Sequence, residues 1–175
     1  MIQEDKRLEY FDKLIKFATN PEFIKHIKTL KEKYDKVDIP HGVNKKIFLI
    51  DNLIFDIPLG EDKKTVLDQF ILSYTNILSS QELEIYKGFK KNIFSCFQVT
   101  TKSGPNMIFQ DIVDEKEYCI NDAIAINGIP TGKYVIARIL PFENYYVLTG
   151  ACAVFETNEK EQAINLARKI KILVL

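Results

Sequence analysis

The chain has 175 residues, of which 46% are hydrophobic and 27% are charged, as in an ordinary globular protein. Its 24 basic and 24 acidic side chains give a formal net charge of zero. That balance excludes a strongly basic field for nucleic acid but leaves a local patch open. The longest apolar runs fall short of the ~18 residues that indicate a membrane span.

The amino-terminal segment predicts a hairpin of two amphipathic helices. In residues 3–18 helical spacing relates Leu8, Phe11, Leu14, Ile15 and Ala18. Asn20 and Pro21 then start a second helix over about 21–35, because Pro is favoured at the first helical position. We expect this hairpin (1–40) to precede an α+β domain (41–175), or the whole chain to be one domain. An exposed apolar stripe on either helix would point to a homodimer.

The middle of the chain predicts extended and helical segments. Residues 46–57, interrupted by Asp51 and Asp56, indicate one or two short extended segments. A helix is expected over about 62–78. Ser79 and Glu82 match a capping box, so another helix should begin there and run to about Lys90.

After Asn92 the sequence becomes aromatic and β-branched, which predicts short strands with tight turns. The expected strands are 93–101, 107–113, 117–121, 133–140 and 145–155. Because five short strands leave two edges unless they curl, we expect a small antiparallel barrel or strongly bent sheet over about 93–155. A capping pattern at Asn158 to Glu161 then starts a closing C-terminal helix. The predicted fold class is α+β with helices before and after the β unit.

The segments LIDNLIFDIPL, IFSCFQVTT, MIFQDIVDEKEYCI and TGKYVIARILPFENYYVLTG resemble a group of uncharacterised bacterial proteins. In that group helices precede a small β domain, and some members end in a SEC-C type Cys/His zinc motif. This chain lacks the motif, since only Ile, Leu, Val and Lys follow Arg168. The resemblance covers about residues 47–155 and implies a fold and a bacterial origin, with no activity to transfer.

Arg138 is a single charge in a strand otherwise built of apolar and aromatic residues. If Val135, Ala137 and Ile139 face the core, Arg138 lies on the outer face with its head in water. If the other face is buried, Arg138 needs a partner, and Asp111 is the natural candidate. We favour the outward arrangement, with contact to a ligand as the alternative.

Three functions stay open at this point. The favoured one is a non-catalytic protein-binding or accessory module, with a binding surface at Arg138, Tyr145, Tyr146 and Lys133. Tyr145 and Tyr146 are adjacent, so alternation should turn at least one aromatic ring outward. The second is nucleic-acid binding by a surface of lysines and tyrosines from the β unit and the helix before it: Lys87, Lys90, Lys91, Lys102 and Lys133 with Tyr86, Tyr134, Tyr145 and Tyr146. The third is a metal-dependent hydrolase that uses Asp51, Asp56 or Asp111.

Motifs for catalysis and cofactors are missing from the sequence. No nucleotide-binding glycine motif or close Cys/His spacing occurs, so we expect no cofactor and no metal. His26 and His41 are the two histidines, and nothing near them supports a thiol–imidazole pair. Cys96, Cys119 and Cys152 are interpreted as buried structural thiols. Without a signal-peptide pattern, a reducing cytoplasm is the expected location, with no membrane association.

Overall fold

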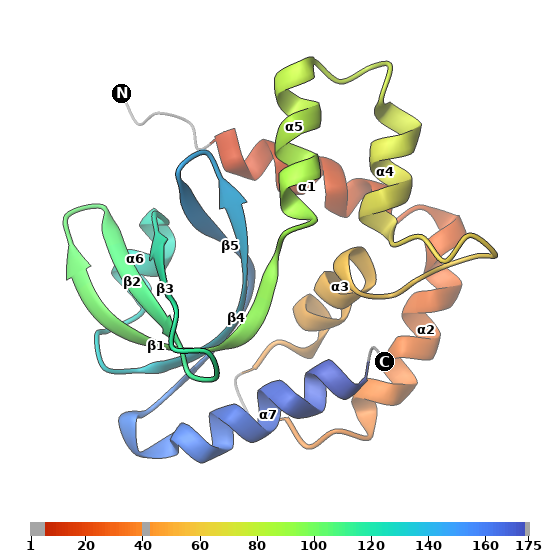
Figure 1. Ribbon diagram of the computed structural model, residues 1–175. Coiled ribbons are helices and arrows are strands. Elements are labelled where there is room, and N and C mark those ends of the chain that lie inside the picture. Colours follow the sequence, from red (N-terminus) through yellow and green to blue (C-terminus); the bar gives the residue numbers. More distant parts are fainter. Residues whose placement is uncertain (1–5, 40–42, 174–175) are drawn as a thin grey trace.

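The computed structural model describes residues 6–39 and 43–173. Helices gather on one side of a curved five-stranded sheet, with α7 crossing below it (Figure 1). The chain is α+β, as predicted. In chain order the elements are α1 (Lys6–Ala18), α2 (Pro21–Asp35), α3 (Lys45–Phe55), α4 (Val66–Tyr74), α5 (Ser80–Phe89), β1 (Ile93–Ser103), β2 (Asn106–Asp111), β3 (Glu117–Ile120), α6 (Ala123–Gly128), β4 (Tyr134–Phe142), β5 (Tyr145–Phe155), the 3₁₀ turn η1 (Thr157–Glu159) and α7 (Lys160–Ile172).

Several helices begin where the sequence signals indicate. Pro21 is the first residue of α2. Ser79 and Glu82 form the capping box that starts α5, and the Ser79 amide donates to the Glu82 carboxylate over 2.9 Å. α4 begins at Val66, later than expected, behind a second capping box. At the C-terminal helix the cap forms before η1 at Glu156, two residues earlier than the predicted Asn158.

Residues 45–55 form the helix α3, so the prediction of short extended segments over 46–57 was wrong. Asn44 caps this helix by accepting a hydrogen bond from the Lys46 amide over 3.1 Å. α1, α2, α4 and β5 surround the helix. Because nearly all of its sides are buried, nearly all of them are apolar. A short, uniformly apolar run has no clear period, which is why the sequence favoured strands.

The five strands pair in the order β1-β2-β3-β5-β4, and β4 returns to β1, which is the order of a closed barrel. The sheet is mixed, so the expectation of an all-antiparallel unit was wrong. β3 and β5 run parallel, joined at Ile120 and Tyr146 and by the Asn121 amide, which donates to the Tyr146 carbonyl over 3.0 Å. No hairpin joins β3 to β5, because α6 and β4 lie between them in the chain.

Two hydrophobic cores meet at β4. Val135, Ala137 and Ile139 face the inside of the strand ring with residues of β1, β2, β3 and α6. Tyr134, Ile136 and the other alternating residues face the helices. Because α5 and α7 also pack on this strand, both faces of β4 are buried.

The N-terminal hairpin belongs to the helical core. α1 contacts α3 and α4, while α2 contacts α3. Leu14, Ala18, Leu30 and Tyr34 are buried in the same core as α3, α4 and α5. The division that we expected near residue 40 is therefore not a division of the hydrophobic core.

Candidate functional site

Arg138 is buried, with 1% of its surface exposed. The outward-facing interpretation was therefore wrong. Val135, Ala137 and Ile139 do face the interior of the strand ring, as that interpretation required. The opposite face, however, is covered by helices and not by water.

The guanidinium of Arg138 is held by side chains from α3, from its C-cap and from the residue just before β1. Nε donates to Asp51 Oδ2 over 2.6 Å, and Nη2 donates to Asn52 Oδ1 over 3.3 Å. Nη1 donates to Asp56 Oδ1 over 3.2 Å, and Asp56 also accepts from Nη2. Asn92, just before β1, accepts from Nη1 as well. Arg138 thus ties α3 and its C-cap to the sheet.

Aromatic rings and a tyrosine complete the surroundings of this network. The guanidinium carbon lies 5.0 Å from the ring centre of Phe55 and 5.2 Å from that of Phe94. Asn52 donates from its amide to the Tyr34 hydroxyl over 2.6 Å. Burial raises the pKa of Tyr34, and the nearby carboxylates add to that rise, so this hydroxyl stays neutral.

The network holds two carboxyl groups for one guanidinium. Burial raises the pKa of Asp56 although Arg138 opposes that rise. Among the described residues Asp51 Oδ1 has no hydrogen-bond partner, and the side chain of Asp51 is only 3% exposed. When both carboxyl groups are ionised, the cluster carries one excess negative charge.

Asp111 is not the partner of Arg138, so that second prediction was wrong. It ends β2, where its Oδ1 accepts from the Val113 amide over 2.7 Å. This hydrogen bond fixes the turn into β3. The three acidic residues proposed for hydrolysis therefore do not converge: Asp51 and Asp56 meet at Arg138, and Asp111 shapes a turn.

The other predicted binding residues lie apart from Arg138 and from one another. Tyr145 packs toward the helical core, its ring centre 5.9 Å from that of Phe142. Tyr146 packs toward the strand interior, 5.2 Å from Tyr118. Both side chains are half-buried, so the expectation that one ring points outward was wrong. Lys133 forms an ion pair with Glu156 before β4.

The lysine–tyrosine surface considered for nucleic acid does not assemble as a platform. Tyr86 and Tyr134 are buried in the helical core. Lys87 and Lys90 form ion pairs with Glu84 and Asp68, over 2.9 and 2.7 Å. Exposed aromatic rings between free lysines are what single-stranded nucleic acid requires.

The thiols and histidines do not form a nucleophilic pair in the described residues. Burial raises the pKa of Cys96 and of Cys152 to about 12, which keeps both thiols protonated. His26 lies on α2, and His41 falls outside the described residues. Within 6–39 and 43–173 no three His, Cys, Asp or Glu side chains gather as a metal site would need.

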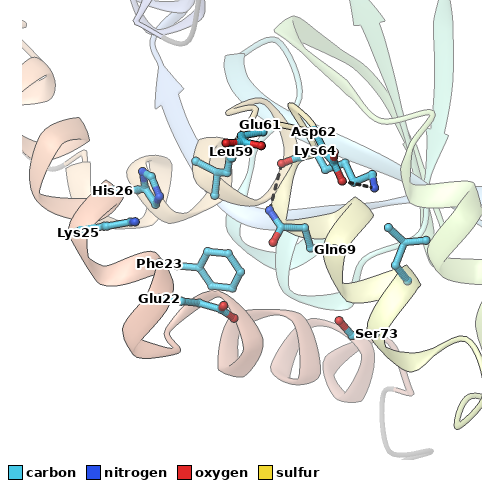
Figure 2. A pocket seen from close by; sticks show the side chains of 12 residues that line it. Glu22, Phe23, Lys25, His26, Leu59, Glu61, Asp62, Lys64, Gln69 and Ser73 are labelled. Atoms are coloured by element: carbon cyan, nitrogen blue, oxygen red, sulfur yellow. Dashed lines mark hydrogen bonds and ion pairs between the residues drawn. The ribbon is translucent and has the colours of Figure 1, made fainter.

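A wide polar cavity of about 680 Å³ lies between α2, the loop before α4, and α4 (Figure 2). His26 and Glu61 come from opposite walls. The two dashed lines in Figure 2 join Lys64 to Asp62 and to Gln69. Ser73 lies at the other end of the cavity from His26. Its acidic and basic side chains are mixed. Among its described lining residues no nucleophile lies beside a base, so the cavity lacks the pair that nucleophilic catalysis requires.

A second hollow is apolar and lies between α1, α3, α6 and β5. It consists of an outer cavity of about 350 Å³ and an inner one of about 90 Å³ that share Phe11, Ile15 and Thr149 as walls. We call these two cavities together the groove. The groove collects four of the large apolar side chains that the structure describes as exposed: Leu8, Ile15, Ile47 and Ile124.

Among the side chains that the structure describes, the charged ones that line the groove are all acidic. Asp12 and Asp122 line the outer cavity, and Asp51 lines the inner one. Asp122 also caps α6 by accepting from the Ala125 amide over 3.0 Å. Sequence reasoning missed this surface because Leu8 and Ile15 fit the buried stripe of α1. The signal was the width of that stripe, five apolar residues, of which only Phe11, Leu14 and Ala18 are buried.

Comparison with known proteins gives one match. The profile of the family of unknown function DUF7986 matches residues 4–172. The chain belongs to this family. No curated protein and no solved structure matches it.

The match to DUF7986 spans every element from α1 to α7, and thus both cores and the groove. No described helix of this DUF7986 chain is both long and apolar enough to cross a membrane.

Proposed function

We propose that this DUF7986 protein is a non-catalytic module that binds another protein through the groove. The observation that carries the proposal is the convergence of Leu8, Ile15, Ile47 and Ile124, each at least 40% exposed, around one hollow. Contiguous exposed apolar surface marks interaction sites on proteins. The bacterial origin and cytoplasmic location expected from the sequence accompany this proposal as predictions.

Charge favours a partner that is different from this chain. Asp12 and Asp122 line the outer cavity, and no basic side chain does among those that the structure describes. Two copies joined through the same groove would bring these carboxylates together, which costs free energy. A segment with apolar anchors and flanking basic side chains complements both features. A homodimer, which the exposed Leu8 and Ile15 of α1 also suggest, is an alternative outcome of the test.

The test is affinity capture from host lysate treated with nuclease, using matched variants. Ile124→Glu places a charge at the groove, where Ile124 is 71% exposed. Val113→Glu is the control, because Val113 is 78% exposed and lies in the β2–β3 turn. We expect a protein that the wild type and Val113→Glu retain and that Ile124→Glu loses at least about tenfold.

Three outcomes would contradict the proposal. One is a partner that both variants retain, because the groove would not hold it. Another is material recovered only without nuclease, which would favour the nucleic-acid alternative. The third is a concentration-dependent dimer in sedimentation that Ile124→Glu dissolves, which would make a second copy the occupant.

A further inference from the structure

The inner end of the groove combines aliphatic walls with one carboxylate. Its cavity of about 90 Å³ is lined mainly by Leu, Ile and Phe side chains of α1 and α3. Thr149 is its one uncharged polar lining residue, and Asp51 is its one charged one. Thr149 stands there because β5 bulges opposite Arg138, where Ala137 pairs with Cys152 but Ile139 pairs with Leu148.

Asp51 has one oxygen engaged and one free. Oδ2 accepts from Arg138, whereas Oδ1 is buried and lacks a partner among the described residues. Buried carboxylate oxygens normally accept hydrogen bonds, and leaving one without a donor is unfavourable. Arg138 pairs with both Asp51 and Asp56. Lys171 also acts on Asp56, so Oδ1 of Asp51 is the atom that can accept from a further cation.

The shape of this cavity selects among cations. The inner cavity, with a volume of about 90 Å³, is small beside the outer one of about 350 Å³. Hydrated metal ions need several oxygen ligands, and the aliphatic walls offer none. A lysine side chain fits better, because its apolar stem packs on such walls and its compact ammonium carries three donors. The planar guanidinium of arginine is broader.

We infer that the inner end of the groove binds an alkylammonium group, and that the partner fills it with a lysine side chain. This inference rests on the proposed function and adds the chemistry of the anchor. Less than 1 Å² of Asp51 Oδ1 is exposed, so the surrounding side chains must move before the ammonium contacts this oxygen. A shift of that kind makes the isolated side chain a weak ligand.

The direct probe is n-butylammonium, which carries the four carbons and the charge of the lysine side chain. Titration into ¹⁵N-labelled protein at constant ionic strength should shift the amide signals of residues 50–55 and 149 saturably. We expect 1-butanol, its uncharged counterpart, to bind at least about tenfold more weakly, because it lacks the charge-assisted hydrogen bond to Asp51. Absence of saturable shifts at these residues, or equal affinity for both compounds, would overturn the inference.

Two variants complete the experiment. Asp51→Asn should remove the preference for the ammonium over the alcohol, and an unchanged preference would overturn the inference. Since Asp51 supports Arg138, this variant could fail to fold. Ile15→Phe then decides: Ile15 borders both cavities, so the larger ring should block both compounds. Ile24→Phe on α2, at similar exposure, should leave binding unchanged.

The two proposals fail in different ways. If Ile124→Glu loses a protein partner but n-butylammonium does not bind, the lysine anchor is wrong and the protein-binding function stands. If n-butylammonium binds at Asp51 but no captured protein depends on the groove, the function is wrong and the inner site is a site for small amines.

Discussion

Arg138 is the residue on which α3 and the sheet both depend. Removing a guanidinium from water costs several kcal/mol unless partners replace the lost hydration. Here Asp51, Asp56, Asn52 and Asn92 together accept from all three of its nitrogens. Burial alone would lower the pKa of Arg138, but Asp51 and Asp56 raise it by a larger amount, so the charge is kept.

Replacement of Arg138 should therefore destabilise the whole fold. In Arg138→Met the buried Asp51 and the half-buried Asp56 lose their cation, and we expect the free energy of unfolding in urea to fall by about 3–5 kcal/mol. Lys133→Met is the matched control, because the Lys133–Glu156 pair lies at the surface and should contribute less than about 1 kcal/mol. A loss in Arg138→Met as small as the loss in Lys133→Met would show that the buried network does not stabilise the fold.

The partners of Arg138 could not be read from the sequence. Alternation along β4 correctly separated its two faces, but it does not say whether the second face meets water or helices. Asp51 is 87 residues away from Arg138 in the chain and lies on a segment that the sequence favoured as extended. As a residue of α3 it faces β4, whereas Asp111 was chosen because it was near in the expected hairpin.

At the scale of elements, local capping signals predicted where helices begin, and β-branched and aromatic composition predicted the strands. The capping box at Ser79 and the Pro at the start of α2 act on the local backbone, so their effect does not depend on the tertiary surroundings. The five strands were expected within a few residues of their positions, because β-branched and aromatic runs between turn residues are specific. α3 and the parallel β3–β5 junction depend on tertiary packing, and so the sequence did not predict them.

The cap of α5 gives a prediction with a pH signature. Glu82 bonds to Lys13 and to Ser79, which lowers its pKa to about 2. A lowered folded pKa means that this stabilisation is complete above about 4.5, the usual value, and is lost as the pH falls toward about 2. Ser79→Ala should cost about 1 kcal/mol at pH 7.

The measurement is urea unfolding at pH 7 and at pH 2. The difference between the wild type and Ser79→Ala should shrink at the lower pH, because the Ser79 hydroxyl donates to the Glu82 carboxylate and protonation of Glu82 weakens that hydrogen bond. Ser80→Ala, one residue further along α5, is the control and should change little at either pH. An equal cost at both pH values would contradict the role assigned to the ionised cap.

At the scale of the whole molecule, the helical layer leaves one apolar hollow uncovered. α1 buries Leu14 and Ala18 against the other helices, and its residues Leu8, Phe11 and Ile15 line the groove beside α6 and β5. The larger polar cavity between α2 and α4 has no comparable group of exposed apolar side chains. Among its described lining residues, only Leu72 is a large apolar side chain that is exposed. This contrast is the reason why we propose the groove as the binding site.

Site-specific photo-crosslinking in host cells tests that assignment most directly. A benzophenone amino acid at position 124 probes the groove. Position 72 probes the polar cavity between α2 and α4, and position 77 probes a cavity of about 500 Å³ between α1 and α4, both at comparable exposure. A protein-binding groove predicts a discrete crosslinked product from position 124 and none from 72 or 77. Products from 72 or 77 without one from 124 would contradict it.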